Sequence, residues 1–382
     1  MKIGLFYELQ TPRPWDAESE QRVVREALDQ IELADEIGID YVWAVEHHFL
    51  EEYCHCSAPE VFLAAASQRT SRIRLGHGIV HTPPPINHPA RVAERVAMLD
   101  QVSQGRVEFG SGEGASEIEF GAFGLDRQSK HEAWEEGFRA AVGMLAEGSY
   151  AGVEGKYVQF PRRSVVPKPY QKPHPPLWMA CNRKEKIIEA ASLGLGALNF
   201  SFGVKPGLSG KYVRDYWEQV EAGYEPLGVV PNFNLAIVTG FMCAAKREEA
   251  LEGFREMQFF MHCLATYFRP GSEWPDAVNL RESFGDGSKV PADEYGYDRS
   301  DPGSLGIFGD PASVRRDLLA YDASGVDQVI LVAQVGALPH EKIMTSLELL
   351  GREVLPEIKE RDAAATAAKR ERLQRLGVAS GV

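Results

Sequence analysis

Short apolar runs alternate along most of the chain with longer segments whose apolar residues recur every three or four positions. This alternation predicts parallel β-strands joined by helices. The predicted strands cover residues 2–7, 41–46, 72–80, 106–111, 176–181, 196–201, 234–243 and 328–335. The predicted helices cover residues 19–38, 58–70, 88–105, 129–148, 183–194, 208–223, 246–268 and 311–325. Eight strands with eight crossover helices close most simply into a single (β/α)8 TIM barrel.

A glycine-rich stretch at residues 109–116, FGSGEGAS, is the main argument for the alternative architecture, an open doubly wound sheet. The stretch follows a predicted strand, as a dinucleotide-binding loop does. However, no helix begins at its last glycine, and no acidic residue ends a strand at the distance expected for a ribose contact. We therefore favour the barrel, in which these glycines let the backbone turn over a ligand or leave the sheet.

Three segments exceed a minimal barrel. Residues 150–175 predict a short hairpin followed by a Pro-rich run, and residues 269–303 form a long acidic stretch typical of a lid or a disordered loop. Beyond residue 338 we expect one amphipathic helix that packs on the barrel and continues as a charged, solvated helical tail over residues 359–382. The barrel domain is expected to span residues 1–358.

Composition narrows the class of protein. A chain of 382 residues with 44% hydrophobic and 25% charged side chains suits one enzyme-sized domain. A net charge of -14 without a basic stripe argues against a nucleic-acid partner. The first residues lack the pattern of a signal peptide and no apolar stretch is long enough to cross a membrane, so we expect a cytoplasmic protein without a membrane partner.

Cysteine and histidine residues concentrate after the second predicted strand, where they raise the question of a metal site. The five cysteines are an odd number scattered over the chain, which does not suggest a disulfide framework. Zinc sites usually show a second ligand pair at a set spacing, and none follows here. We therefore expect a loop without a metal ion. The residues of this cluster are His47, His48, Cys54, His55 and Cys56.

Barrel enzymes carry their chemistry at the carboxyl ends of the strands. The residues expected there lack the carboxylate and histidine pairs of a metal-dependent barrel hydrolase. Several are small residues that expose the backbone, which suits a flat aromatic cofactor lying across the barrel mouth. The set is Glu46, His47, His48, His77, Gly78, Ile79, Ser111, Gly112, Glu113, Gly114, Cys181, Asn182, Arg183 and Ser201.

Four stretches between residues 2 and 358 resemble the bacterial luciferase-like flavin monooxygenases: VEHHF at 45–49, INHPARVAERVAMLDQVSQGRVEFGSGEG at 86–114, KPHPPLWMA at 172–180 and LPHEKIMTSLELLGREVLPEI at 338–358. The resemblance implies a barrel that binds reduced FMN, which a separate NAD(P)H–flavin reductase supplies. It also implies that O2 is used to oxygenate a small organic substrate through a peroxyflavin, which the protein shields from water.

The same resemblance assigns residues. His47 corresponds to the catalytic histidine beside the flavin ring, and an imidazole can manage proton transfers near neutral pH. Glu46 and His48 are expected to support its loop, and the Gly78–Ile79 bond corresponds to a non-proline cis peptide under the flavin. The cofactor contacts implied by position are Gly78, Ile79, Ser111, Gly112, Met179, Ala180, Cys181, Asn182, Arg183 and Ser201.

Phosphate binding is where the chain departs from luciferase. The arginine that holds the flavin phosphate is replaced by Glu113, and an acid cannot hold a phosphate dianion. Arg183 and Lys184, at the start of a predicted helix, are the nearest replacement cations, although surface helix charges are an equal alternative. Asn182 keeps a hydrogen-bond donor, and Lys130 aligns approximately with another family arginine.

Other functions stay open. An F420-dependent oxidoreductase on the same barrel would transfer hydride without O2, and Glu113 slightly favours it. A metal-dependent hydrolase and a flavin-storing or light-emitting accessory protein are further alternatives. The substrate is expected to be apolar or aromatic. A homodimer is expected through the helices at residues 58–70 and 88–105. The aromatic candidates for the substrate pocket are Phe6, Trp43, Phe49, Phe200 and Phe202.

Overall fold

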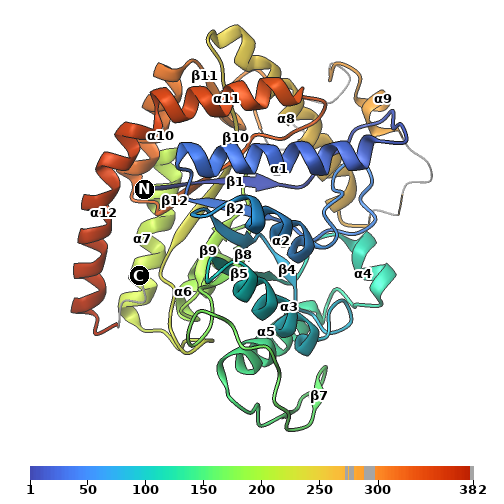
Figure 1. Cartoon of the computed structure of the whole chain (residues 1–382), viewed down its shortest axis with the longest axis vertical. Coiled ribbons are helices and arrows are strands. Elements are labelled where there is room, and N and C mark those ends of the chain that lie inside the picture. The colour runs from blue at the N-terminus through green and yellow to red at the C-terminus, as the bar shows by residue number, and fades with distance from the viewer. Residues whose placement is uncertain (272–273, 275–278, 288–296, 379–382) are drawn as a thin grey trace.

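The computed structural model describes residues 1–271, 274, 279–287 and 297–378, and within them eight parallel strands close a barrel (Figure 1). In order around the barrel the strands are β1 (Lys2–Tyr7), β2 (Tyr41–Ala44), β3 (Arg74–His77), β5 (Val107–Gly112), β8 (Leu177–Cys181), β9 (Gly196–Asn199), β10 (Leu235–Cys243) and β12 (Gln328–Val332). The barrel closes because β10 pairs with β9 and β12 pairs with β1. The predicted (β/α)8 barrel is confirmed, and the open sheet is excluded.

Helices surround the strands as the periodicity predicts (Figure 1). Proline stands in the first turn of several of them, where its missing N–H has no partner to lose. Helix α1 ends at Gly38, which takes a left-handed φ of 90°. The crossover helices are α1 (Ser19–Ile37), α2 (Pro59–Arg69), α3 (Pro89–Val102), α5 (Lys130–Ala146), α6 (Lys184–Ser192), α7 (Pro206–Ala222), α8 (Arg247–Phe268) and α10 (Pro311–Ser324). None of the helices in the described ranges is long and apolar enough to cross a lipid bilayer.

Several short elements lie outside the repeating pattern. The predicted strand at residues 72–80 is two strands, because β3 ends at a cis Gly78–Ile79 peptide and β4 (Val80–His81) then pairs with β5. The predicted hairpin at residues 150–175 is present as β6 (Val153–Glu154) and β7 (Gln159–Phe160). Elements that the periodicity did not predict are α4 (Glu117–Phe123), α9 (Leu280–Phe284), η1 (Pro302–Ser304) and β11 (Gly306–Gly309). The suggested lid at residues 269–303 lies partly outside the described residues.

The C-terminal segment differs from the single helix that its pattern predicts. It forms α11 (His340–Glu353) and α12 (Leu355–Arg375), with the break at Val354. Pro356 explains the break, since proline lacks the N–H that would continue α11. Helix α12 is also anchored rather than fully solvated: Leu355, Ile358 and Leu373 are buried.

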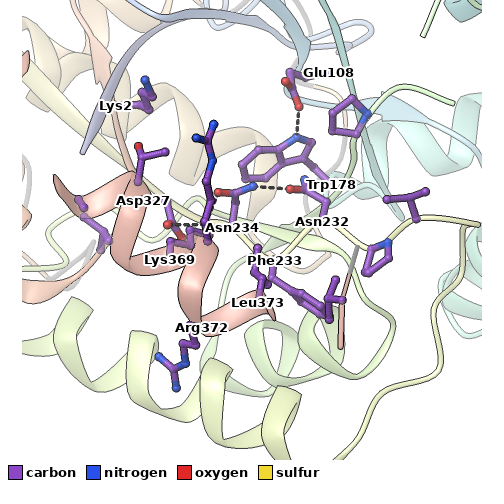
Figure 2. A pocket seen from close by; sticks show the side chains of 18 of the residues that line it. Lys2, Glu108, Trp178, Asn232, Phe233, Asn234, Asp327, Lys369, Arg372 and Leu373 are labelled. Carbon is purple, nitrogen blue, oxygen red and sulfur yellow. Dashed lines mark hydrogen bonds and ion pairs between the residues drawn. The ribbon is translucent and has the colours of Figure 1, made fainter. Parts of the chain in front are cut away.

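A cavity of about 570 Å³ lies at the amino ends of the strands, between the barrel and α12 (Figure 2). Lys369 of α12 reaches its wall and bonds to Asp327 at 2.5 Å. Glu108 and Trp178 lie on the barrel side of the cavity, where the indole N–H of Trp178 donates to Glu108 at 2.6 Å. Enzymes with this fold carry their active site at the opposite, carboxyl end of the strands, so this cavity is separate from the expected site.

Candidate active site

His47 follows β2 at the carboxyl end of the barrel, as expected. Its Nδ1 is 3.1 Å from a carboxylate oxygen of Glu119, and the same oxygen accepts the backbone N–H of His48 at 2.8 Å. Burial alone would lower the pKa of His47, but the carboxylates of Glu119, Glu8 and Glu46 outweigh it and raise the pKa to about 9. The pairing also holds the pKa of Glu119 below its usual value in spite of burial. At neutral pH the pair is therefore an imidazolium with a carboxylate.

Aromatic rings and a second buried carboxylate surround His47. The rings of Tyr53 and Phe268 lie 5.7 and 5.4 Å from the imidazole, centroid to centroid. The Tyr53 hydroxyl donates to Glu8 at 2.8 Å, and burial raises the pKa of Glu8. These neighbours leave the His47 side chain only 15% exposed, so water has limited access to it.

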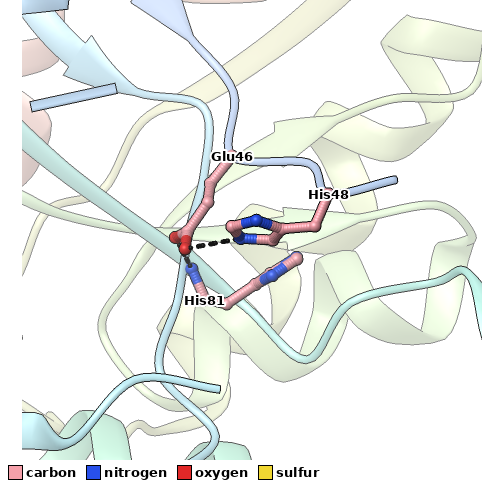
Figure 3. Close-up of side chains that lie close together, drawn as sticks. All are labelled: Glu46, His48 and His81. Atoms are coloured by element: carbon pink, nitrogen blue, oxygen red, sulfur yellow. Dashed lines mark hydrogen bonds and ion pairs between the residues drawn. The ribbon is translucent and has the colours of Figure 1, made fainter. Parts of the chain in front are cut away.

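Glu46 fixes the loop that carries His47. One carboxylate oxygen faces Nε2 of His48 at 3.1 Å and accepts from the Asn87 amide at 2.7 Å, while the other accepts the backbone N–H of His81 at 2.8 Å. Although burial would raise the pKa of Glu46, these hydrogen bonds and the neighbouring histidines lower it to about 2. Figure 3 shows that the side chains of Glu46, His48 and His81 lie close together. Glu46 and His48 thus have the contacts expected of supporting residues.

The small residues expected under a cofactor ring come together beside the cis peptide. Gly78 and Ile79 form the cis bond that the family resemblance implies. A Cβ added to Gly112 would lie 3.1 Å from side-chain atoms of both Ile79 and Ala180, so these three residues lie next to one another. A bulkier residue at position 112 would crowd this part of the barrel mouth.

Other residues expected to contact the cofactor are buried or hydrogen-bonded to neighbouring residues of the protein. The Ser111 hydroxyl is buried, bonds to Thr82 at 2.7 Å and accepts from the Trp134 indole at 3.1 Å. Met179 and Cys181 are also buried in β8. Towards the surface, the Ser201 hydroxyl donates to the carbonyl oxygen of Asn182 at 2.8 Å, which joins the loops after β8 and β9.

A cationic cluster lies where the fourth and fifth barrel strands, β5 and β8, end. Lys130, at the start of α5, and Lys186, in the first turn of α6, approach Glu113 to 3.7 and 3.8 Å. Lys186 also donates to His131 at 3.1 Å, and its side chain is only 9% exposed. Burial lowers the pKa of Lys130, as do nearby cations including Arg183, although Glu113 opposes the shift. Lys186 is also paired with Glu189 at 2.9 Å, so the two lysines and the N-termini of two helices meet around two acids, Glu113 and Glu189. Helix N-termini and lysines are groups that suit an anion.

Arg183 and Lys184, the two cations that the sequence suggests for the phosphate, point away from Glu113 towards other acids or solvent. Lys184 is drawn to Asp215 on α7 at 2.9 Å and is half exposed. Arg183 is 58% exposed and 3.7 Å from Glu185. Lys130 and Lys186 are therefore better placed beside Glu113 than Lys184 is.

Of the aromatic residues expected to line a substrate pocket, four pack against other rings or in the barrel interior, and the fifth, Phe49, is exposed. Trp43 is fully buried and fills the barrel interior, where a Cβ on Gly76 would come within 2.1 Å of its ring. Phe6 and Phe200 pack against each other at 5.5 Å, and Phe202 packs on Phe260. Phe49 is 48% exposed and lies 5.5 Å from Phe123.

Sequence reasoning missed Glu119, Glu8 and Lys186. The pattern Ser116-Glu117-Ile118-Glu119 matches a helix-capping box and could have revealed α4. In the structure the Glu119 carboxylate turns to His47 instead of capping the helix. Lys186 carries no local signal, because Glu113 lies 73 positions earlier in the chain, after β5, and meets Lys186 only in the folded barrel.

Comparison with known proteins agrees with this geometry. The model of the luciferase-like monooxygenase family matches residues 1–328. Over 94% of its length the chain is 26% identical to the oxygenase component of flavin-dependent trigonelline monooxygenase from Acinetobacter baylyi, and the match covers 96% of that protein. With several other curated relatives the match spans only 53% to 59% of the relative's length.

Solved structures show the same likeness. Monooxygenase RslO1 from Streptomyces bottropensis has a TM-score of 0.75 at 26% identity, over 94% of this chain and all (100%) of that one. The F420-dependent tetrahydromethanopterin reductase from Methanopyrus kandleri shares the fold, with a TM-score of 0.66 at 21% identity over 93% of this chain and 99% of that one. With its barrel, its partly buried His47 and a family match over most of its length, this chain is an enzyme of the luciferase-like monooxygenase family.

Proposed function

We propose that the protein is a flavin-dependent monooxygenase that uses reduced FMN and O2 to oxygenate a small apolar or aromatic molecule. The observation that carries the proposal is the position of α4 between the two halves of the site. Glu119 bonds to His47, while the next residue, Phe120, has the ammonium of Lys130 5.1 Å from its ring centre. One short helix thus sets a protonated imidazole and an anion-binding cluster on the same rim of the barrel.

The residues present fit FMN. Lys130, Lys186 and the N-termini of α5 and α6 suit the phosphate, and the contact of Gly112 with Ile79 and Ala180 provides a small-residue floor for a flat ring. Reduced flavin would supply the electrons that activate O2. His47 would hold a proton beside the reacting atoms at neutral pH, with Glu119 fixing its orientation.

The surroundings of His47 support an apolar or aromatic substrate. Tyr53 and Phe268 form an aromatic wall next to the imidazole, with their ring centres 5.4 Å apart, and Tyr53 packs in turn on the buried Phe260. Such a wall recognises shape and apolar surface and offers few hydrogen bonds.

A separate reductase that delivers reduced flavin in the cytoplasm is part of the proposal, because the relative from Acinetobacter is an oxygenase component. A homodimer through α2 and α3 is proposed as well. Val61, Met98 and Val102 expose apolar side chains on these helices, with 67%, 53% and 40% of their surface accessible. Substitution of Met98 by glutamate is expected to shift the molar mass measured by light scattering from dimer to monomer.

Lys186→Met tests the cofactor assignment. Lys186 is expected to contact the phosphate, so the variant should bind reduced FMN about tenfold more weakly or worse, by the usual strength of a charge-assisted hydrogen bond. Riboflavin, which lacks the phosphate, should bind equally to the variant and the parent protein. Lys184→Met is the matched control, because Lys184 is paired with Asp215, and it should change neither affinity. Equal loss for FMN and riboflavin would contradict the phosphate role.

F420-dependent hydride transfer is the second candidate. Glu113 favours it, since this acid occupies the centre of the cluster that would hold the FMN phosphate. Anaerobic titrations with reduced FMN and reduced F420 separate the two functions. Tight F420 binding without FMN binding, and no reductase-dependent O2 consumption, would reverse the order.

A further inference from the structure

His81 is the most unusual buried side chain near the site. It ends β4, is fully buried, and neither of its ring nitrogens has a hydrogen-bond partner among the described residues. Buried polar atoms are nearly always paired, and an exception calls for a specific reason such as an ion. Neither the flavin nor the oxygenation chemistry proposed above uses this imidazole.

Two further donors lie next to His81. Donor atoms of Glu46, His48 and His81 all lie within 4.8 Å of one another, and Figure 3 shows the three side chains converging. Nε2 of His48 and Oε1 of Glu46 are 3.1 Å apart. Ligands of a tetrahedral zinc ion, with bonds of about 2.0–2.1 Å, stand about 3.3 Å from each other, so this pair needs little movement to share an ion.

We propose that Glu46, His48 and His81 form a binding site for one divalent transition-metal ion, with Zn2+ as the expected occupant. Two imidazoles and one carboxylate are a ligand set that such ions accept, and they leave a further position for water. The ion would join the loop after β2 to β4, directly beside His47.

Surrounding hydrogen bonds hold the ligands in place, as they do in established metal sites. The Asn87 amide donates to Glu46 at 2.7 Å and to the carbonyl oxygen of His81 at 3.0 Å. Arg95 in turn donates to Asn87 at 2.8 Å. The backbone N–H of His81 donates to the second oxygen of Glu46. The same amide therefore bonds to the Glu46 carboxylate and to the backbone of His81.

A second triad, His47, Glu119 and His81, also brings its donor atoms within 4.8 Å. We favour the first triad because Glu119 already bonds to the ring of His47 and to the backbone of His48, and its side chain is fully buried.

The test is a titration of the flavin-free protein with Co2+, followed by its visible absorption bands, and with Zn2+ by calorimetry. The parent protein should bind one equivalent. His81→Ala and His48→Ala should each weaken binding at least about tenfold, and Asn87→Ala should weaken it about 10- to 100-fold through loss of ligand orientation. His48 is partly exposed, so its variant should fold even where loss of the buried His81 ring impairs folding.

His88→Asn is the control, because His88 is exposed and its Nδ1 accepts only the first-turn N–H of Ala90, a capping role that asparagine can fill. It should bind Co2+ as the parent does, and so should His47→Ala. Absence of stoichiometric binding, or full binding by folded His48→Ala, would overturn the proposal. Loss of binding in His47→Ala with retention in His48→Ala would place the ion at the second triad and would also overturn it. No flavin takes part, so these outcomes are independent of the proposed oxygenase function.

Discussion

Replacement of Glu119 by glutamine should remove the charge on His47 at neutral pH. Glutamine keeps the size of the side chain and an oxygen for the His48 N–H, but it no longer provides the carboxylate that faces Nδ1 of His47 at 3.1 Å. The pKa of His47, about 9 in the parent protein, should fall towards 6.5, because Glu119 is the largest of the contributions that oppose burial. A tenfold change in a protonation equilibrium corresponds to about 1.4 kcal/mol, so the shift from 6.5 to about 9 corresponds to about 3 kcal/mol.

The assay is an NMR titration of the His47 ring, combined with urea unfolding as a function of pH. Because the folded-state pKa is raised, the stabilisation from this pair is fully present below pH 6.5 and is lost as the pH rises towards about 9. The parent protein should therefore lose stability from this group between those two values, and Glu119→Gln should not. If His47 is the proton donor, the alkaline limb of the pH–rate profile should move to lower pH in the variant.

Glu117→Gln is the matched control. Glu117 lies two residues before Glu119 on α4 and forms an ion pair with Arg127 at the surface. Loss of its charge should therefore leave the His47 titration unchanged. A His47 pKa that stays near 9 in Glu119→Gln would refute the assignment of Glu119 as the cause.

Three further variants test the packing of the barrel by urea unfolding. Gly110→Ala should lower the free energy of unfolding by about 3 kcal/mol or more, because the new Cβ would stand 2.0 Å from the His77 carbonyl oxygen. A variant as stable as the parent would mean that β3 and β5 can separate there. Arg74→Met should lower the free energy of unfolding by about 3–5 kcal/mol at neutral pH, because Glu108 is left buried without its cation. The loss should be smaller in acid, where Glu108 takes up a proton, and a loss independent of pH would contradict this cause. Ile358→Ala should cost about 2–5 kcal/mol, since this side chain of α12 is fully buried. A negligible loss would mean that α12 is only loosely attached.

The strands and crossover helices were predictable because each one has a local pattern. The run at residues 234–243 is apolar throughout, and β10 is buried at every position. Short elements without such a pattern were not predictable: β11 has four residues and is defined by its pairing with β10. The break at Val354 did have a local signal in Pro356, but the amphipathic pattern runs on across it and predicts one helix.

The candidate site was predictable only where a motif or a strand end marked it. His47 stands in such a motif, and the structure places it at the barrel mouth. Its partner Glu119 is 72 residues away along the chain and becomes a neighbour only when α4 folds over the barrel. Closeness to a strand end in sequence predicts Arg183 and Lys184 as the phosphate cations. In the structure Lys184 turns to Asp215, and Lys186 approaches Glu113 instead.

The cavity beneath α12 contains a tryptophan whose fluorescence can report on the end of the barrel opposite to His47. Trp178 lies in its wall with its indole N–H bonded to Glu108, and Leu373 of α12 lies on the other side. Lifting of α12 would bring solvent to this indole and move its fluorescence to longer wavelengths. Emission during mild heating would then distinguish early detachment of the C-terminal helix from melting of the barrel as a whole.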